Sequence, residues 1–286
     1  MKLRVVWRAA QLGITLAVCA LDLAVRRLRG PLTLEQRTLW MHKSCRAVLS
    51  SLHVDCQVHG HPPPAGLLVA NHLSYLDIGV LGAAMPCFFV SKEEVRRWPY
   101  FGTLARANGT LFLTRSSRSS TNRVAKLIAE RLAFPAPIIL FPEGTSTDGS
   151  ALLRFHPSLY EPAIQGNAAI TAAALRYLPA AGAHERDFCW FGDDAFLPHL
   201  FKVLGTHGFS AEVRFGTPKV YADRREAAIG THKEIAAMRA VGASVHAPPE
   251  HSASRSDCGL DRARDCALMD CEVESQDRQA ARLEPC

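Results

Sequence analysis

A histidine and an aspartate five residues apart are the first side chains in the sequence that suit catalysis. His72 and Asp77 lie in the segment 71–77, directly after the apolar run 66–70. If that run is a buried strand, His72 leaves its C-terminal end and Asp77 lies at the turn into the next helix. A carboxylate so placed can bind one imidazole nitrogen and leave the other as a general base near neutral pH. The spacing alone is common by chance, so further residues have to support this interpretation.

A polar loop follows a second apolar run. The run 138–141 ends at Pro142, and Glu143, Gly144 and the three hydroxyl residues 145–147 come next. Such a loop at the end of a strand has exposed backbone N–H groups that can hold phosphate or other headgroup oxygens. By itself it is equally well explained as an ordinary turn.

An arginine ends a third run of this kind. Arg115 follows the predicted strand 110–114, and Arg118 lies close behind it. A guanidinium at a strand end suits bidentate binding of a phosphate or a carboxylate. A lone arginine is more often a solvated surface residue.

The rest of the chain from residue 53 supplies elements that bring these strand ends together. Further strands are expected at 53–59, 87–90, 169–175 and 211–215, and helices at 76–84, 119–133, 194–204 and 223–240. Alternating strands and helices predict an α/β fold, with a single domain built on a largely parallel central sheet flanked by helices. Ligands bind beyond the carboxyl ends of such strands, where the three candidate sites lie.

The N-terminal residues 1–52 predict a membrane-associated helical hairpin that precedes this domain. The stretch 9–25 is mostly apolar and has basic residues on both sides, and 34–52 has apolar residues at helical spacing. A helix embedded in one leaflet is the favoured interpretation of 9–25, with a true span, a buried core helix and a signal peptide as alternatives. The run ends in Arg26 and Arg27 without a small-residue cleavage site, which argues against a signal peptide.

Composition limits the remaining possibilities. Of 286 residues, 48% are hydrophobic and 21% charged, which excludes a disordered chain and a multi-span membrane protein. The net charge of +6, with basic residues concentrated near the N-terminus, favours an anionic lipid surface over nucleic acid. Nine cysteines, mostly single in apolar segments, indicate a reducing compartment, no disulfide framework and no metal site. We expect the catalytic domain at 53–243 and a polar, disordered tail at 244–286.

The three polar sites occur in an order that resembles a known family. Segments 71–77 (Asn-His-x4-Asp), 109–115 (Gly-x2-Phe-x2-Arg) and 141–145 (Phe-Pro-Glu-Gly-Thr) resemble the first three motif blocks of the glycerolipid acyltransferases. The nearest subgroups are the 1-acylglycerol-3-phosphate acyltransferases and the lyso-ornithine lipid acyltransferases, and the resemblance covers roughly residues 35–240. Other features that match this family are Lys92, 99–102, 190–193 and 198–199, and the segment 190–193 resembles the lyso-ornithine lipid subgroup slightly more.

The resemblance implies an O-acyltransferase that moves a fatty acyl group from acyl-CoA or acyl carrier protein to the free hydroxyl of a lysolipid. The first acceptor to consider is 1-acyl-sn-glycerol-3-phosphate, with lyso-ornithine lipid as the alternative. His72 would be the base and Asp77 its orienting partner. The headgroup ligands would be Arg115, Glu143, Gly144, Thr145 and, as a weaker candidate, Lys92. No cofactor besides the acyl donor is implied, and the expected location is the cytoplasmic face of a membrane, the inner membrane in a bacterium.

Two other classes of function stay open at this point. A hydrolase using His72 and Asp77 would need an activated serine or a metal, and neither motif is recognisable. A silent lipid-binding protein would be expected to have lost one of the two residues. The family's fourth block usually carries a proline where 170–173 has alanine, which bears on acyl preference.

Overall fold

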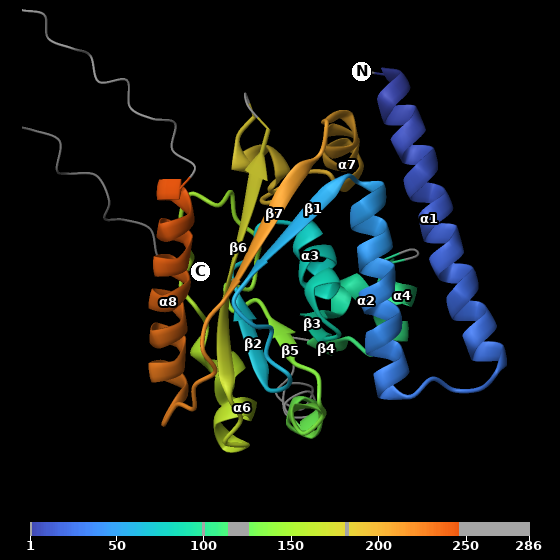
Figure 1. The fold of residues 1–286 in the computed structure, drawn as a ribbon. Coiled ribbons are helices and arrows are strands. Elements are labelled where there is room, and N and C mark those ends of the chain that lie inside the picture. The colour runs from blue at the N-terminus through green and yellow to red at the C-terminus, as the bar shows by residue number, and fades with distance from the viewer. Residues whose placement is uncertain (1, 99–100, 114–125, 181–182, 246–286) are drawn as a thin grey trace, which may run out of the picture. The chain divides into compact units, whose positions relative to one another are not determined.

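The central sheet is α/β and almost entirely parallel, as predicted. The computed structural model describes residues 2–98, 101–113, 126–180 and 183–245 (Figure 1). Seven strands lie in the order β1-β7-β6-β2-β5-β3-β4, and every neighbouring pair is parallel except β6 with β7. The strands are β1 (Val54–His59), β2 (Leu67–Ala70), β3 (Phe88–Lys92), β4 (Leu111–Leu113), β5 (Ile138–Leu140), β6 (Ile170–Pro179) and β7 (Phe209–Phe215).

Helices cover both faces of the sheet, so the central strands are apolar at consecutive positions. In β2, Leu68 and Ala70 face a core with α3, α7 and the N-terminal helices, while Leu67 and Val69 face a core with α6 and α8. The helices are α1 (Lys2–Leu28), α2 (Leu34–Ser51), α3 (Leu76–Ala84), α4 (Phe101–Asn108), α6 (Glu161–Gln165), α7 (Phe196–Gly205) and α8 (Arg224–Val245), with 3-10 helices η1 (Glu93–Arg97), η2 (Pro157–Tyr160) and η3 (Glu185–Phe188). Residues 126–132 are also helical.

The predicted N-terminal hairpin is present as α1 and α2, which run side by side (Figure 1). A capping box between Thr33 and Gln36 starts α2, so the turn after α1 is sharply defined. The inner face of α1 buries Leu12 and Leu23. Its outer face exposes apolar side chains along its whole length: Leu3, Val6, Trp7, Ile14, Val18, Leu21, Val25 and Leu28. By length and composition alone, α1 is long and apolar enough to cross a bilayer.

Two arginines attach the start of α1 to the body of the protein. Arg4 and Arg8 donate to the carbonyls of Gly205 and Thr206, at 3.2 and 2.8 Å, where α7 ends. The last carbonyls of a helix lack partners within that helix and carry partial negative charge, so guanidinium groups suit them. The first turns of α1 therefore belong to the same packed unit as α7.

The structure departs from the predicted elements in a few places. α4 and α6 were not predicted, because eight- and five-residue helices show too little periodicity. β6 extends to Pro179 instead of ending near residue 175, and it runs antiparallel to β7. Of the predicted helix 119–133, residues 126–132 are helical and 119–125 lie outside the described residues.

The predicted boundaries of the domain and tail stay predictions. α2 ends at Ser51, close to the expected limit at residue 52, and α8 continues to Val245. The expected tail therefore lies outside the described residues except for 244 and 245. Five single cysteines carry free thiols, and all but Cys56 are buried, as expected for small core residues.

Candidate active site

Asn71 fixes the end of β2 from which the candidate catalytic histidine extends. Its amide is fully buried and exchanges two hydrogen bonds with the backbone of Leu175 on β6. The Leu175 N–H donates to Oδ1 (2.7 Å), and Nδ2 donates to the Leu175 carbonyl (3.1 Å). Because β2 and β6 are parallel neighbours, these two hydrogen bonds continue their pairing past Ala70. His72 therefore leaves the carboxyl edge of the sheet from a fixed position.

Asp77 accepts hydrogen bonds from four donors. Its carboxylate lies in the first turn of α3 and is fully buried. Oδ2 accepts from Nδ1 of His72 at 2.7 Å. The same oxygen accepts from the backbone N–H groups of Leu73 (2.7 Å) and Ser74 (3.0 Å). Oδ1 accepts from the Tyr177 hydroxyl. A buried carboxylate is tolerated when donors surround it, so these bonds fix it beside the imidazole.

The His72 side chain is held on several sides and still reaches solvent. Its ring stacks on Phe141, with centroids 4.1 Å apart and planes 17° apart, and the side chain is 21% exposed. Its backbone N–H donates to Glu143 Oε1 (2.9 Å), and its carbonyl accepts from the Thr147 N–H (2.9 Å). With Nδ1–H donating to Asp77, Nε2 carries the lone pair. Such an imidazole can take a proton from a hydroxyl and pass it to a leaving group.

Glu143 lies at the site, and its carboxylate is bonded within the protein, so its role as a headgroup ligand stays a prediction. The carboxylate is 4% exposed, and its two oxygens accept from the backbone N–H groups of His72 and Leu153, each at 2.9 Å. Burial raises the pKa of Glu143 above its usual value, and the two N–H bonds partly oppose this shift. The geometry therefore favours a positioning role, in which Glu143 ties the loop after β5 to the backbone of His72.

The rest of that loop is also partly used within the protein. Gly144 has φ +72°, a left-handed conformation that suits glycine, and its N–H donates to the Phe141 carbonyl (3.1 Å). The N–H of Thr147 is taken by His72. The prediction of a loop with outward backbone N–H groups is therefore wrong for these two positions. The Thr145 side chain is exposed and stays a predicted headgroup contact.

Of the two predicted cations, Lys92 lies farther along the same sheet edge. Lys92 ends β3 and is exposed, and it pairs in register with Leu113, the last residue of β4. Lys92 is thus two strands away from β2 in the sheet order. Arg115 lies outside the described residues, so its role stays a prediction.

The segment after η3 packs directly on the His72 loop. The backbone N–H of Trp190 donates to the Leu73 carbonyl at 2.9 Å, and the Trp190 ring meets Tyr75 edge to face. The Tyr75 hydroxyl lies 3.1 Å from Nδ1 of His199 on α7. The segments 190–193 and 198–199, singled out in the sequence for their resemblance, are thereby placed beside the candidate catalytic residues.

Arg239 on α8 joins three parts of the site that the sequence did not connect. Its guanidinium donates to the Gly149 carbonyl (2.8 Å) and the Leu175 carbonyl, and it forms an ion pair with Glu185 (2.9 Å). Glu185 Oε1 in turn accepts the backbone N–H of Tyr177 (3.0 Å). Neither Arg239 nor Tyr177 lies in a sequence pattern that marks it out. Their positions depend on the register of β6 and the docking of α8.

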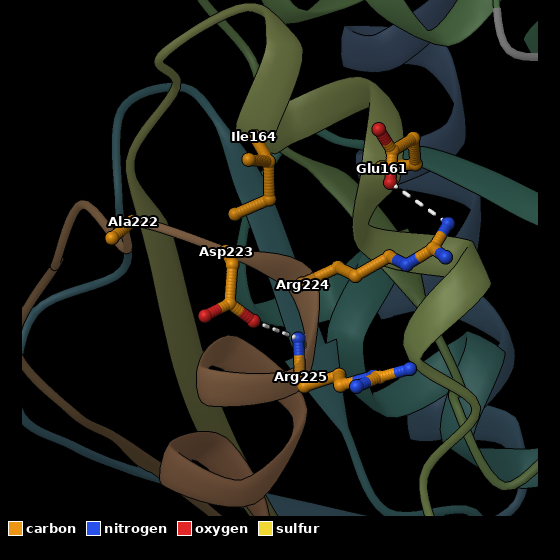
Figure 2. A pocket seen from close by; sticks show the side chains of 6 residues that line it. All are labelled: Glu161, Ile164, Ala222, Asp223, Arg224 and Arg225. Atoms are coloured by element: carbon orange, nitrogen blue, oxygen red, sulfur yellow. Dashed lines mark hydrogen bonds and ion pairs between the residues drawn. The ribbon is translucent and has the colours of Figure 1, made fainter.

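A separate cavity lies near the amino end of β6 (Figure 2). It is lined by residues around the start of α8 and by Glu161 and Ile164 of α6, and an ion pair joins Arg224 to Glu161 (3.0 Å). α6 leads into the amino end of β6, whereas His72 follows the carboxyl end of its parallel neighbour β2. This cavity is therefore not part of the candidate active site.

Comparisons with known proteins agree with this arrangement. Residues 55–176 match the model of the Acyltransferase family, a block that contains His72, Asp77 and Glu143. A lyso-ornithine lipid O-acyltransferase of Pseudomonas aeruginosa is 35% identical over 227 residues, which cover 76% of this chain and 85% of that protein. The chain belongs to the acyltransferase family. The family resemblance of the three sequence blocks is thereby confirmed.

Further relatives fall into both expected subgroups. A lyso-ornithine lipid O-acyltransferase of Rhodobacter capsulatus is 36% identical over 73% of this chain and 79% of that protein. A 1-acyl-sn-glycerol-3-phosphate acyltransferase of Neisseria meningitidis is 36% identical over 48% of this chain and 55% of that protein. The crystal structure of a 1-acyl-sn-glycerophosphate acyltransferase from Thermotoga maritima has the same fold, with a TM-score of 0.64 at 15% identity, covering 85% of this chain and 95% of that one. The acyltransferase is thus of the class that acts on lysolipids.

Proposed function

We propose that this acyltransferase moves a fatty acyl group from a thioester donor to the hydroxyl of a lysolipid, with His72 as the general base. The observation that carries this proposal is the pairing of His72 Nδ1 with the buried Asp77 at 2.7 Å, while the ring stays partly exposed. Asp77 selects the tautomer with the lone pair on Nε2 and stabilises the imidazolium that forms during the reaction.

The bonds exchanged in this reaction balance without any other reactant. Nε2 of His72 takes the proton of the acceptor hydroxyl, and the oxygen attacks the thioester carbonyl carbon. A carbon–oxygen bond forms and the carbon–sulfur bond breaks. The leaving thiolate then takes the proton from the imidazolium and departs as a free thiol. The sequence contains no G-x-S-x-G nucleophile elbow, which agrees with direct transfer from acyl-CoA or acyl carrier protein.

For the acceptor we favour lyso-ornithine lipid over 1-acyl-sn-glycerol-3-phosphate. The relatives named for the first acceptor align over 76% and 73% of the chain, and the Neisseria meningitidis relative named for the second aligns over 48%. Trp190, in the region that resembles the lyso-ornithine subgroup, packs on the loop that carries His72. The phosphate acceptor remains the second candidate because Lys92 ends a strand at the same sheet edge.

We further propose that α1 lies in one leaflet of the membrane, at its cytoplasmic face where the thioester donors are found. Its outer face presents an unbroken apolar stripe. Arg4 and Arg8 hold its first turns against the end of α7, so this part of α1 stays at the level of the catalytic body. An amphipathic helix held in this way buries one side in the interface between headgroups and acyl chains.

The test is an assay of free thiol release by the purified protein in detergent. Wild type is given acyl-CoA or acyl carrier protein with lyso-ornithine lipid, with 1-acyl-sn-glycerol-3-phosphate, or with no acceptor. We expect release that requires a lysolipid and is lost in His72→Ala. The matched control is His207→Ala, since His207 is an exposed histidine outside the site and its loss should leave the rate unchanged. Release without acceptor would indicate a thioesterase, and no release with either donor would contradict the proposal.

A further inference from the structure

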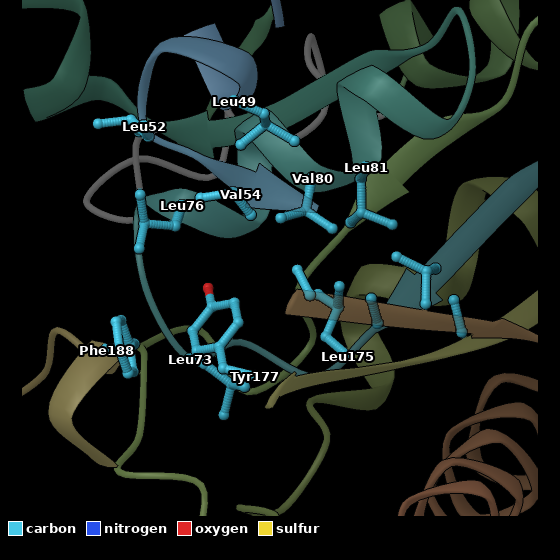
Figure 3. Packing of buried hydrophobic residues seen from close by; sticks show 14 of the residues in the cluster. Leu49, Leu52, Val54, Leu73, Leu76, Val80, Leu81, Leu175, Tyr177 and Phe188 are labelled. Atoms are coloured by element: carbon cyan, nitrogen blue, oxygen red, sulfur yellow. The ribbon is translucent and has the colours of Figure 1, made fainter. Parts of the chain in front are cut away.

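The hydroxyl of Tyr177 is buried within the apolar core beneath the site. Tyr177 on β6 is 1% exposed, and its ring lies among apolar side chains that include Leu73, Leu175 and Phe188 (Figure 3). The ring also meets Phe209 edge to face, with centroids 5.3 Å apart. Its hydroxyl donates to Asp77 Oδ1. A buried hydroxyl needs such a partner, because leaving it without one costs free energy.

The two oxygens of Asp77 have different partners. Oδ2 accepts from His72 Nδ1 and from two backbone N–H groups that belong to the same loop. Oδ1 accepts from Tyr177, a residue 100 positions later in the chain. The phenol therefore donates to the carboxylate oxygen that the imidazole does not use. A stronger hydrogen bond from the phenol leaves less negative charge on the Asp77 carboxylate, which then stabilises the His72 imidazolium less.

The phenol keeps its proton over the pH range in which histidine titrates. Burial raises the pKa of Tyr177 well above its usual value, and the neighbouring Asp77 carboxylate raises it further. Its hydroxyl is thus a constant donor. The strand beneath it is also anchored, since Glu185 accepts the Tyr177 N–H and Asn71 is clipped to Leu175 two residues earlier.

We infer that Tyr177 is a positioning residue that sets the basicity of His72 through Asp77. This inference rests on the proposed function of His72 as the base. Other titratable groups face this cluster: Glu143 from the loop after β5, Glu185 and Cys189 from the segment of η3, and Arg239 from α8. A change at the Tyr177 hydroxyl leaves all of them in place, so its effect on the pH profile can be assigned to that hydroxyl.

Tyr177→Phe removes the hydroxyl and keeps the ring. With one donor fewer, the carboxylate holds the imidazolium more strongly, so the His72–Asp77 pair loses its proton at higher pH. We expect the acidic limb of the profile of kcat/KM against pH to move by roughly one unit to higher pH. At pH values below the limb, kcat/KM of Tyr177→Phe should be about tenfold lower than that of wild type, and above the limb it should approach the wild-type value. KM for the lysolipid should change less than twofold.

Tyr160→Phe is the matched control. Tyr160 is as deeply buried, and its hydroxyl pairs with Thr231 Oγ1 at 2.8 Å in the core on the other face of the sheet. We expect a similar fall in Tm for both variants, without movement of the limb in Tyr160→Phe. Should Tyr177→Phe prove too unstable to assay, Tyr177→3-fluorotyrosine keeps the contact and makes the phenol a stronger donor. Its limb should move in the opposite direction, to lower pH.

The outcomes separate the two proposals. Wild type without lysolipid-dependent thiol release defeats the proposed function itself. If wild type shows such release but the acidic limb of the pH profile does not move in Tyr177→Phe or in the fluorinated protein, only the inference about Tyr177 is defeated. Equal movement in Tyr160→Phe and Tyr177→Phe would also overturn it, because a general loss of packing would then explain both.

Discussion

The donors around Asp77 make this carboxylate hard to replace even by its own amide. Four N–H or O–H groups point at two oxygens. An asparagine offers a single oxygen and directs an NH2 group at some of these donors. Because residue 77 is fully buried, solvent cannot reach the donors left without an acceptor, so the asparagine side chain or the imidazole has to rotate.

We therefore expect Asp77→Asn to lower kcat by roughly 10³-fold or more, because the wrong imidazole tautomer is then favoured. The thiol-release assay measures this effect, and a melting curve reports the accompanying loss of stability. Asp187→Asn is a suitable control, since Asp187 pairs with Lys202 in a partly exposed ion pair. Activity of Asp77→Asn within a few fold of wild type would contradict the assigned role.

Glu143 predicts a pH dependence of stability. Its folded-state pKa is raised by burial, so the folded protein holds a proton there after the unfolded chain has released it. The stability contributed by this proton is fully present below the pKa that Glu143 has in the unfolded chain. It is lost as pH rises through the higher pKa that Glu143 has in the folded protein. The Tm of wild type minus that of Glu143→Gln should thus be largest near pH 4 and fall to a plateau at neutral pH. A difference that grows with pH would contradict the direction of the shift.

At the scale of elements, α8 is more than a cover for the sheet. Its C-terminal half carries Arg239, which bonds to the loop after β5, to β6 and to Glu185 near η3. Its N-terminal end carries Arg224, whose ion pair with Glu161 is partly exposed (Figure 2). One helix thus offers a mostly buried arginine at the site and a half-exposed arginine remote from it.

Arg239→Lys keeps the charge but loses the planar fork that reaches several acceptors at once. We expect it to lower kcat about tenfold and stability by roughly 1–2 kcal/mol, since acceptors behind the site lose their donor. Arg224→Lys should change stability by less than about 0.5 kcal/mol and leave kcat unchanged. Equal effects of the two substitutions would show that Arg239 has no special connection with the site.

The sequence predicts those elements and residues whose evidence is local. His72, Asp77 and the loop at Glu143 lie in short segments at strand ends, so their meeting follows from a parallel sheet. Tyr177 contacts Asp77 only through the register of β6 against β2, which no local pattern encodes. The antiparallel pairing of β6 with β7 was missed for a similar reason, because a helix between two strands usually connects parallel neighbours.

At the scale of the molecule, one surface differs from the rest. Among the described residues, the outer face of α1 exposes large apolar side chains from Leu3 to Leu28, while Leu197 and Phe201 form a shorter pair on α7 and Ile229 on α8 has no such run beside it along its helix. Continuous apolar stripes of this kind mark membrane or partner contacts.

Ile14→Glu should therefore weaken binding to vesicles of anionic phospholipid by about tenfold or more, because a buried isoleucine contributes roughly 1.5–3 kcal/mol. Ile229→Glu makes the same exchange at a comparably exposed position, 56% against 65%, and should bind as wild type does. Co-flotation with vesicles measures both. Thiol release with detergent-dispersed lysolipid should be unchanged in each. Equal binding by Ile14→Glu and wild type would remove the outer face of α1 from the membrane contact.

The strand order also sets a sequence of events during synthesis. Among the strands that the structure describes, β1 is the first to leave the ribosome, and its partner in the sheet, β7, is the last. His72 emerges long before β6 brings Tyr177 and the partner of Asn71, and before α8 brings Arg239. The hairpin of α1 and α2 is synthesised before β1. We therefore expect the nascent chain to reach the lipid surface while its catalytic machinery is still unassembled, and to gain activity only after α8 has been made.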